Sequence, residues 1–305
     1  MGLSRTVTTL TVSFALLGGG VTVAAREGAP LRVPLKNPAV AEPARSTDPS
    51  PAAAPPCGPS SDAVLSLPDA SAPGGQRAVW VHRPAGPDYA DLPVVYLLHG
   101  YPADPAALAH GSLPGLLDRE MCRTGRPFVL AVPDGRAGRL DTEWGDDARG
   151  RFAVETFVTR QAVALVEGGL RRAPTRRVIA GFSMGGYGAA ALALRHPDEY
   201  GQVAAFGGYF RIDDPDHVFG ADPGAHDPGR LLASAGGQRY FLVEGRDEHT
   251  ALQRGSIRGE AERFAAELRS HQVTVAVVHP PGGHGNEAWY PELGAMVDFL
   301  DAGWV

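Results

Sequence analysis

The stretch Arg177-Val-Ile-Ala-Gly-Phe-Ser183-Met-Gly-Gly186 decides the fold. An apolar strand pattern runs into Gly-x-Ser-x-Gly and then into an alanine-rich helical pattern, which is the signature of a nucleophile elbow. Such a turn cramps the backbone of its serine, so the flanking residues must be small, and Gly181 and Gly185 meet that need. In a chain with 39 glycines the bare motif would carry little weight. The strand before it and the helix after it predict Ser183 as a nucleophile.

Short β-rich runs alternate with helical patterns from about Asp62 onward, which predicts an α/β domain with a mostly parallel, eight-stranded sheet and helices on both faces. The strands are expected at Ala63–Leu67, Arg77–His82, Val94–His99, Phe128–Pro133, Arg177–Ala180, Gln202–Phe206, Tyr240–Val243 and Thr274–His279. The helices are expected at Leu113–Met121, Glu155–Gly168, Gly185–Arg195, Ile257–His271 and Pro291–Leu300. The irregular loop 134–150 is rich in Gly, Asp and Arg, and we expect it to line a substrate site.

The composition describes a globular chain of 305 residues with 44% hydrophobic content. Its formal net charge of −6 provides no basic surface field, so nucleic acid is not an expected partner. We expect a small-molecule, carbohydrate or lipid ester as the substrate, with no cofactor and no metal, because the sequence has no Cys-x-x-Cys cluster, His-Glu-x-x-His or Gly-x-x-x-x-Gly-Lys loop. The acidic segment Tyr209–Arg230 lacks a defined ligand spacing and is interpreted as a solvated loop rather than a metal site.

Residues 1–25 are predicted to be a signal peptide, with Arg5 before an apolar run over Leu10–Val23 and small residues at its end. Export is therefore expected. A retained membrane anchor is the alternative, which Gly18-Gly-Gly20 disfavours because glycine weakens a helix. Residues 26–61 are rich in Pro, Ala and Ser and are interpreted as a linker, which leaves 62–305 as the catalytic domain.

The chain has two cysteines, Cys57 at the end of the linker and Cys122 inside the domain. In an exported protein a disulfide between them would pin the linker to the domain. Two unrelated thiols are the alternative, with Cys122 as a small buried apolar residue.

Serine needs a base within hydrogen-bond reach and an acid that orients the base. His284 is predicted as the base because it lies in a flexible Gly-rich loop directly after the last expected strand, and His249 is the second choice. The acid is expected after Tyr240–Val243, where Asp247 is preferred and Glu248 stays open as the alternative.

Two backbone amides should stabilise the oxyanion that forms when the serine attacks a carbonyl. One is expected from Met184, which follows the nucleophile, and the other from Tyr101, which follows the strand-end sequence Leu97-Leu-His-Gly100.

With these residues in place, the chain from Arg77 to Leu300 resembles the α/β-hydrolases of the esterase D and secreted mycolyltransferase group, which includes feruloyl esterases, acetyl-xylan esterases and S-formylglutathione hydrolase. The resemblance rests on Leu97-Leu-His-Gly100, Val132-Pro-Asp-Gly135, Gly181-Phe-Ser-Met-Gly-Gly186, Gly245-Arg-Asp-Glu248 and Gly282-Gly-His284. It implies the α/β-hydrolase fold and a triad at Ser183, Asp247 and His284. The segment around Asp247 is one residue shorter than the group's usual Gly-x-x-Asp spacing, so Glu248 stays open.

The leading hypothesis is a secreted serine esterase that hydrolyses carboxylic esters through an acyl-Ser183 intermediate. Acyl transfer to the alcohol of a sugar or lipid would use the same residues. A non-catalytic binding module on the same scaffold is the third hypothesis. Because the serine, acid and histidine occur in the expected order, an enzyme is favoured.

Overall fold

The computed structural model describes residues 58–304 except for residues 87, 171 and 250–255. The predicted signal peptide, most of the linker and Cys57 lie outside this range, so export and the disulfide to Cys122 stay predictions. In the part of the chain that is described, no helix is long and apolar enough to cross a membrane.

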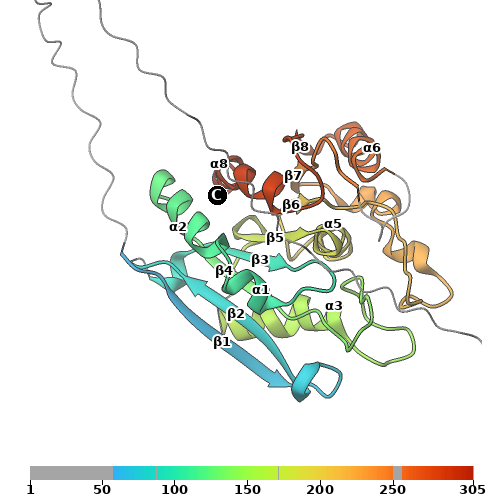
Figure 1. Cartoon of the computed structure of the whole chain (residues 1–305), viewed down its shortest axis with the longest axis horizontal. Helices are drawn as coiled ribbons and strands as arrows, with labels where there is room; N and C mark the ends of the chain where they lie inside the picture. The colour runs from blue at the N-terminus through green and yellow to red at the C-terminus, as the bar shows by residue number, and fades with distance from the viewer. Residues whose placement is uncertain (1–57, 87, 171, 250–255, 305) are drawn as a thin grey trace, which may run out of the picture. The chain divides into compact units, whose positions relative to one another are not determined.

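A single mixed sheet forms the centre of the domain, with the strand order β1-β2-β4-β3-β5-β6-β7-β8 (Figure 1). Strands β4, β3, β5, β6, β7 and β8 are parallel to one another, whereas β2 is antiparallel to both β1 and β4. The strands are β1 (Ser61–Pro68), β2 (Gln76–Arg83), β3 (Val94–Leu98), β4 (Val129–Pro133), β5 (Arg177–Phe182), β6 (Gln202–Phe206), β7 (Arg239–Val243) and β8 (Thr274–Val278). The predicted mostly parallel, eight-stranded sheet is confirmed.

Helices cover both faces of this sheet. The α-helices of the described residues are α1 (Pro105–Ala109), α2 (Leu113–Thr124), α3 (Val154–Thr156), α4 (Val163–Glu167), α5 (Met184–Arg195), α6 (Ile257–Ser270), α7 (Asn286–Trp289) and α8 (Leu293–Asp301). Short 3₁₀ turns lie at Pro73–Gly75, Tyr89–Asp91, Pro174–Arg176, Pro223–His226, Pro228–Arg230, Leu232–Ser234 and Tyr290–Glu292. The apolar faces of α3 to α6 pack on one side of the sheet, and those of α1, α2, α7 and α8 pack on the other.

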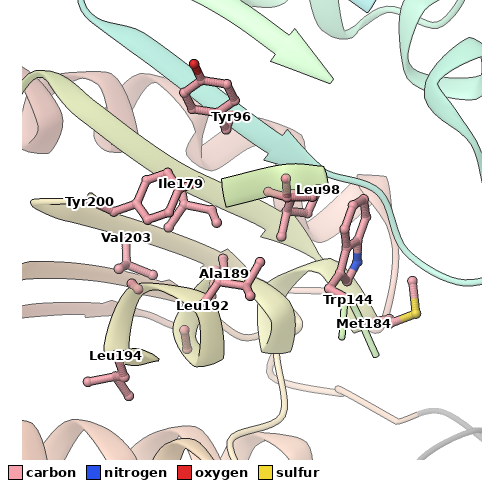
Figure 2. Close-up of a cluster of buried hydrophobic side chains, with 14 of the residues drawn as sticks. Tyr96, Leu98, Trp144, Ile179, Met184, Ala189, Leu192, Leu194, Tyr200 and Val203 are labelled. Atoms are coloured by element: carbon pink, nitrogen blue, oxygen red, sulfur yellow. The ribbon is translucent and has the colours of Figure 1, made fainter. Parts of the chain in front are cut away.

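The central strands are buried on both faces, which explains why they are continuous apolar runs rather than alternating patterns. Figure 2 shows the cluster on the α5 side, where Tyr96 and Ile179 of the sheet lie with Leu192 of α5 in one apolar layer. Trp144 extends this layer toward Met184, so the core reaches directly to the elbow.

Three details of the helices differ from the sequence prediction, one of which is that the four-residue helix α7 was not predicted. The single helix expected at Glu155–Gly168 is α3 and α4 joined by a π-helical turn over Phe157–Ala162. The sequence analysis did not predict α1, which is only five residues long, too short to show helical periodicity. Asp104 begins it by accepting a hydrogen bond from the amide of Ala107 at 2.9 Å.

Candidate active site

Ser183 lies between the end of β5 and the start of α5, with a positive φ of 56° and a ψ of −119°. A residue with a side chain is strained at such a positive φ, and such strain concentrates at functional sites. The surroundings hold the turn in place, since the Ser183 amide donates to Phe206 O at 2.8 Å and the Ser183 carbonyl accepts from the amide of Gly186 at 2.8 Å. The sequence thus forms the predicted strand, turn and helix.

The flanking glycines are required by close backbone packing. A Cβ on Gly181 would lie 2.1 Å from the carbonyl oxygen of Gly185, and a Cβ on Gly185 would lie 2.2 Å from that of Leu98. Gly100 of the next loop approaches Ser183 in the same way, because its Cβ would lie 3.2 Å from the serine Cβ. Only residues without side chains allow β5, the elbow and the end of β3 to meet at this point.

His284 contacts the serine directly, with its Nε2 2.8 Å from Ser183 Oγ. It lies in the loop between β8 and α7, as the sequence analysis predicted. The indole of Trp289 packs against the imidazole edge-on, with the ring centroids 4.9 Å apart, and it also stacks on Phe182 beside the elbow. Trp289 therefore helps to fix the ring of His284, a role that no sequence motif indicated.

The acid beside His284 is Glu248, which corrects the preference for Asp247. Glu248 Oε1 is hydrogen-bonded to His284 Nδ1, and Glu248 Oε2 accepts from the amide of Gly245 at 2.8 Å. The Glu248 side chain is completely buried, whereas Asp247 is exposed. The turn decides this outcome, because the Asp247 amide donates to Gly282 O at 3.0 Å and the Glu248 amide donates to Gly245 O at 3.1 Å.

Glu248 also stands at the third position after Gly245, so it occupies the Gly-x-x-acid position of the resembled group. The other residues considered for the site lie elsewhere. His249 is exposed and has no contact with the serine among its described interactions. Glu244 is fully buried directly after β7, where burial and the neighbouring charge of Glu248 raise its pKa well above the usual value.

Tyr101 and Met184, the predicted sources of the oxyanion amides, both line one cavity of about 150 Å³ next to the elbow. Met184 is the first residue of α5, so its amide has no acceptor within the helix. The Tyr101 side chain is anchored by its hydroxyl, which donates to Arg139 O at 3.0 Å. Both residues thus lie beside this cavity next to the elbow, and the role of their amides as oxyanion donors stays a prediction.

His99 ties the loop of Tyr101 to the loop after β4. Its Nε2 accepts from the amide of Gly135 at 3.0 Å, and its Nδ1 lies 3.1 Å from Gly100 O. Because Nε2 accepts, this geometry assigns the ring proton to Nδ1, which donates to Gly100 O. Trp144 Nε1 donates a further hydrogen bond to the backbone carbonyl of His99 at 3.3 Å. These bonds hold the wall of the cavity, which loop 134–150 lines through Gly135, Arg136, Leu140 and Thr142 among others.

Several acidic side chains of loop 134–150 and of the segment Tyr209–Arg230 are buried or partly buried. Burial raises the pKa of Asp141 to about 6, and it raises that of Glu143 well above the usual value. Glu143 Oε2 accepts from Tyr209 OH at 2.8 Å. Asp214, in the segment interpreted as a solvated loop, is in fact buried and accepts from the amide of Val218 at 2.6 Å. The described residues contain no group of side chains arranged to hold a metal ion.

The sequence model of a family described as "Putative esterase" matches residues 70–300. The MPT51/MPB51 antigen of Mycobacterium bovis is 29% identical over 85 residues, and the same antigen of Mycobacterium tuberculosis matches equally. The aligned segment covers 28% of this chain and 28% of the antigen's length.

Solved structures resemble most of the chain. A ferulic acid esterase matches with a TM-score of 0.67 and 22% identity, over 81% of this chain and 99% of that chain. MPT51 of Mycobacterium tuberculosis matches with a TM-score of 0.62 and 21% identity, over 81% and 100%. An S-formylglutathione hydrolase from Staphylococcus aureus matches with a TM-score of 0.61 and 16% identity, over 80% and 99%. These likenesses confirm the α/β-hydrolase fold.

Proposed function

This chain belongs to the family described as "Putative esterase", as its sequence motifs predicted, and from that premise we propose that it is a serine esterase that hydrolyses carboxylic esters through an acyl-Ser183 intermediate. One observation carries the proposal. On a strained elbow, Ser183 Oγ lies 2.8 Å from His284 Nε2, while the opposite nitrogen of the same ring is bonded to the buried carboxylate of Glu248. This is the arrangement that activates a serine hydroxyl.

In the first half of the reaction, Ser183 Oγ attacks the ester carbonyl carbon as His284 Nε2 accepts the hydroxyl proton. Glu248 keeps the second ring proton on Nδ1 and stabilises the imidazolium that forms. The amides of Met184 and Tyr101 would donate to the oxyanion of the tetrahedral intermediate. The carbon–oxygen bond to the alcohol then breaks, and the alcohol leaves with the proton from His284.

In the second half, water attacks the acyl-serine carbonyl carbon and gives a proton to His284 Nε2. The bond to Ser183 Oγ breaks, the serine regains its proton from His284, and the carboxylic acid is released. All protons return to their starting positions, so the residues of the chain are sufficient for the cycle. Acyl transfer differs only in that an alcohol attacks in place of water.

The mechanism is tested with a fluorophosphonate probe and with p-nitrophenyl acetate and butyrate. We expect wild-type protein to be labelled and to turn over both esters, and we expect Ser183→Ala to lose both properties. His284→Ala should lose them as well, whereas the control His249→Ala should keep them, because His249 is exposed and away from the serine. Folded wild-type protein that neither labels nor turns over would refute the proposal. An alcohol series added to the assay separates hydrolysis from transfer.

We also propose that the protein is exported, because residues 1–25 have the pattern of a signal peptide. The test is expression of the full-length chain with and without Arg5→Glu and a charged residue in the run Leu10–Val23. Wild-type protein should appear outside the cytoplasm without its first residues, and the variant should stay inside at full length. Retention of wild type in the membrane at full length would favour the anchor instead.

A further inference from the structure

We propose that Arg136 is a specificity-determining residue that limits the substrate to an ester with a small, largely apolar group, about the size of a benzene ring, on the side of Tyr101 and Met184. The proposal rests on ester hydrolysis at Ser183. Arg136 does not touch the reacting atoms in this role. It acts as the end wall of the cavity next to the elbow.

The size limit comes from the cavity volume of about 150 Å³. An apolar protein cavity of about 150 Å³ holds one benzene molecule. The side chains of Tyr101, Leu140 and Met184 give this cavity apolar walls. A short acyl or alcohol group therefore fits, whereas a longer chain needs more space than the cavity offers.

A larger space lies directly behind Arg136. A second cavity of about 390 Å³ is lined by α1, β1 and β2, and Arg136 lines both cavities. Trp80 and Val64 contribute apolar surface to the second cavity, and Val64 is 68% exposed. Among the described residues the only other exposed large hydrophobic side chain is Leu170. A chain that passed Arg136 would enter this second cavity and bury apolar surface there.

Ion pairs hold Arg136 in its blocking position. Its Nε and Nη2 donate to the two carboxylate oxygens of Asp134 at 2.9 and 2.8 Å, and its Nη1 donates to Asp104 Oδ2 at 2.9 Å. Asp134 is 4% exposed, and although burial alone would raise its pKa, the bonds from Arg136 lower it below the usual range. A bidentate pair has one fixed geometry, so the guanidinium cannot swing aside as a free arginine could.

The experiment measures kcat/KM of the full-length chain in two ester series. One series lengthens the acyl group of p-nitrophenyl esters from acetate to octanoate, and the other lengthens the alcohol of alkyl acetates from methyl to octyl. In wild-type protein we expect a fall of at least about tenfold between four and eight carbons in one series, because overpacking a rigid cavity is unfavourable. The series that falls identifies whether the acyl or the alcohol group occupies the cavity.

Arg136→Ala should join the two cavities and raise the eight-to-four-carbon ratio in that series by more than about tenfold, since each methylene buried in the second cavity is worth about fourfold. Ala106→Phe is the matched control, because Ala106 is exposed on α1 and lines the second cavity but not the first. The double variant Arg136→Ala/Ala106→Phe should return the eight-to-four-carbon ratio toward the wild-type value. Ala106→Phe alone should leave the wild-type profile unchanged.

Leu140→Ala widens the first cavity without removing an ion pair, and it decides the matter if Arg136→Ala does not fold. It should raise the ratio of six-carbon to four-carbon substrates. The proposal is overturned if wild-type activity falls in neither series, or if a folded Arg136→Ala keeps the wild-type ratio. It is also overturned if Leu140→Ala is the only folded variant and its profile does not move. Absence of turnover with every ester would instead refute the esterase activity itself.

Discussion

Replacing Glu248 by glutamine should lower kcat about 10⁴-fold, or about 5 kcal/mol, with little effect on KM. The two carboxylate oxygens face two donors, His284 Nδ1 and the amide of Gly245. An amide offers only one acceptor oxygen. If its nitrogen faces His284, the ring must carry its proton on Nε2, where it cannot accept the proton of Ser183.

If the amide is turned over, its nitrogen meets the amide of Gly245, so that two donors oppose each other. The Glu248 side chain has no exposed surface, and water cannot relieve this contact. An unsatisfied buried group costs about 1–3 kcal/mol, so this second orientation lowers the free energy of unfolding of the variant. Neither orientation supplies a carboxylate charge to stabilise the imidazolium, so both predict loss of activity.

The assay compares Glu248→Gln with Asp247→Asn, which makes the same chemical change one residue away on an exposed side chain. We expect Asp247→Asn to retain kcat within about threefold of wild type, because surface substitutions are usually mild. Urea denaturation establishes that both variants are folded, and p-nitrophenyl butyrate turnover gives kcat. The reasoning is refuted if Asp247→Asn loses the activity and Glu248→Gln keeps it.

Other predictions concern the elbow, the loop beside it and the sheet. Gly185→Ala should destabilise the fold by about 3 kcal/mol or more, since its Cβ would lie 2.2 Å from Leu98 O, and an unchanged urea midpoint would contradict this. Asp141 has a folded pKa of about 6, above its unfolded value near 4, so its contribution to stability is fully present below about pH 4 and is lost as pH rises through 6. Asp141→Asn should remove this loss of stability. If wild type and Asp141→Asn have the same free energy of unfolding at every pH, Asp141 does not make this contribution. Glu167→Gln should cost about 3–5 kcal/mol, because it leaves Arg177 without the buried carboxylate that it contacts at 2.8 Å; a thermal midpoint like that of wild type would count against this.

The strands and the nucleophile could be predicted from sequence because their signals are local. β6 was predicted with the bounds that the structure has, and the other strands were predicted to within two residues at each end. An apolar run indicates a strand that is buried on both faces, and Gly181 and Gly185 indicate that the backbone packs closely at the elbow. His284 was found for a similar reason, since its loop follows the last strand of a parallel sheet and must lie at the edge that carries Ser183.

Chemical type alone could not choose the acid, because Asp247 and Glu248 are neighbouring carboxylates, and the one signal in the sequence was that Glu248 fits the Gly-x-x-acid spacing of the resembled group. The turn is held partly by contacts between distant loops, such as the hydrogen bond from the Asp247 amide to Gly282 O, and in this turn Glu248 faces His284. The contacts of Trp289 and Arg136 with the site are equally non-local. No periodicity or motif in the chain indicates which side chains of different loops contact one another at this edge of the sheet.

Trp144 links the strain of the site to the packing of the core. It has a positive φ of 55°, and its indole is fully buried where Gly135 and Gly188 leave room, since a Cβ on either would approach the ring within 2.7 Å. The same indole donates to His99 O, and His99 holds the loops of both Tyr101 and Arg136. One buried ring thus supports the oxyanion side and the end wall of the cavity together. Because the core fixes that ring, the backbone strain around it can persist in the folded state, and the cavity keeps a defined size.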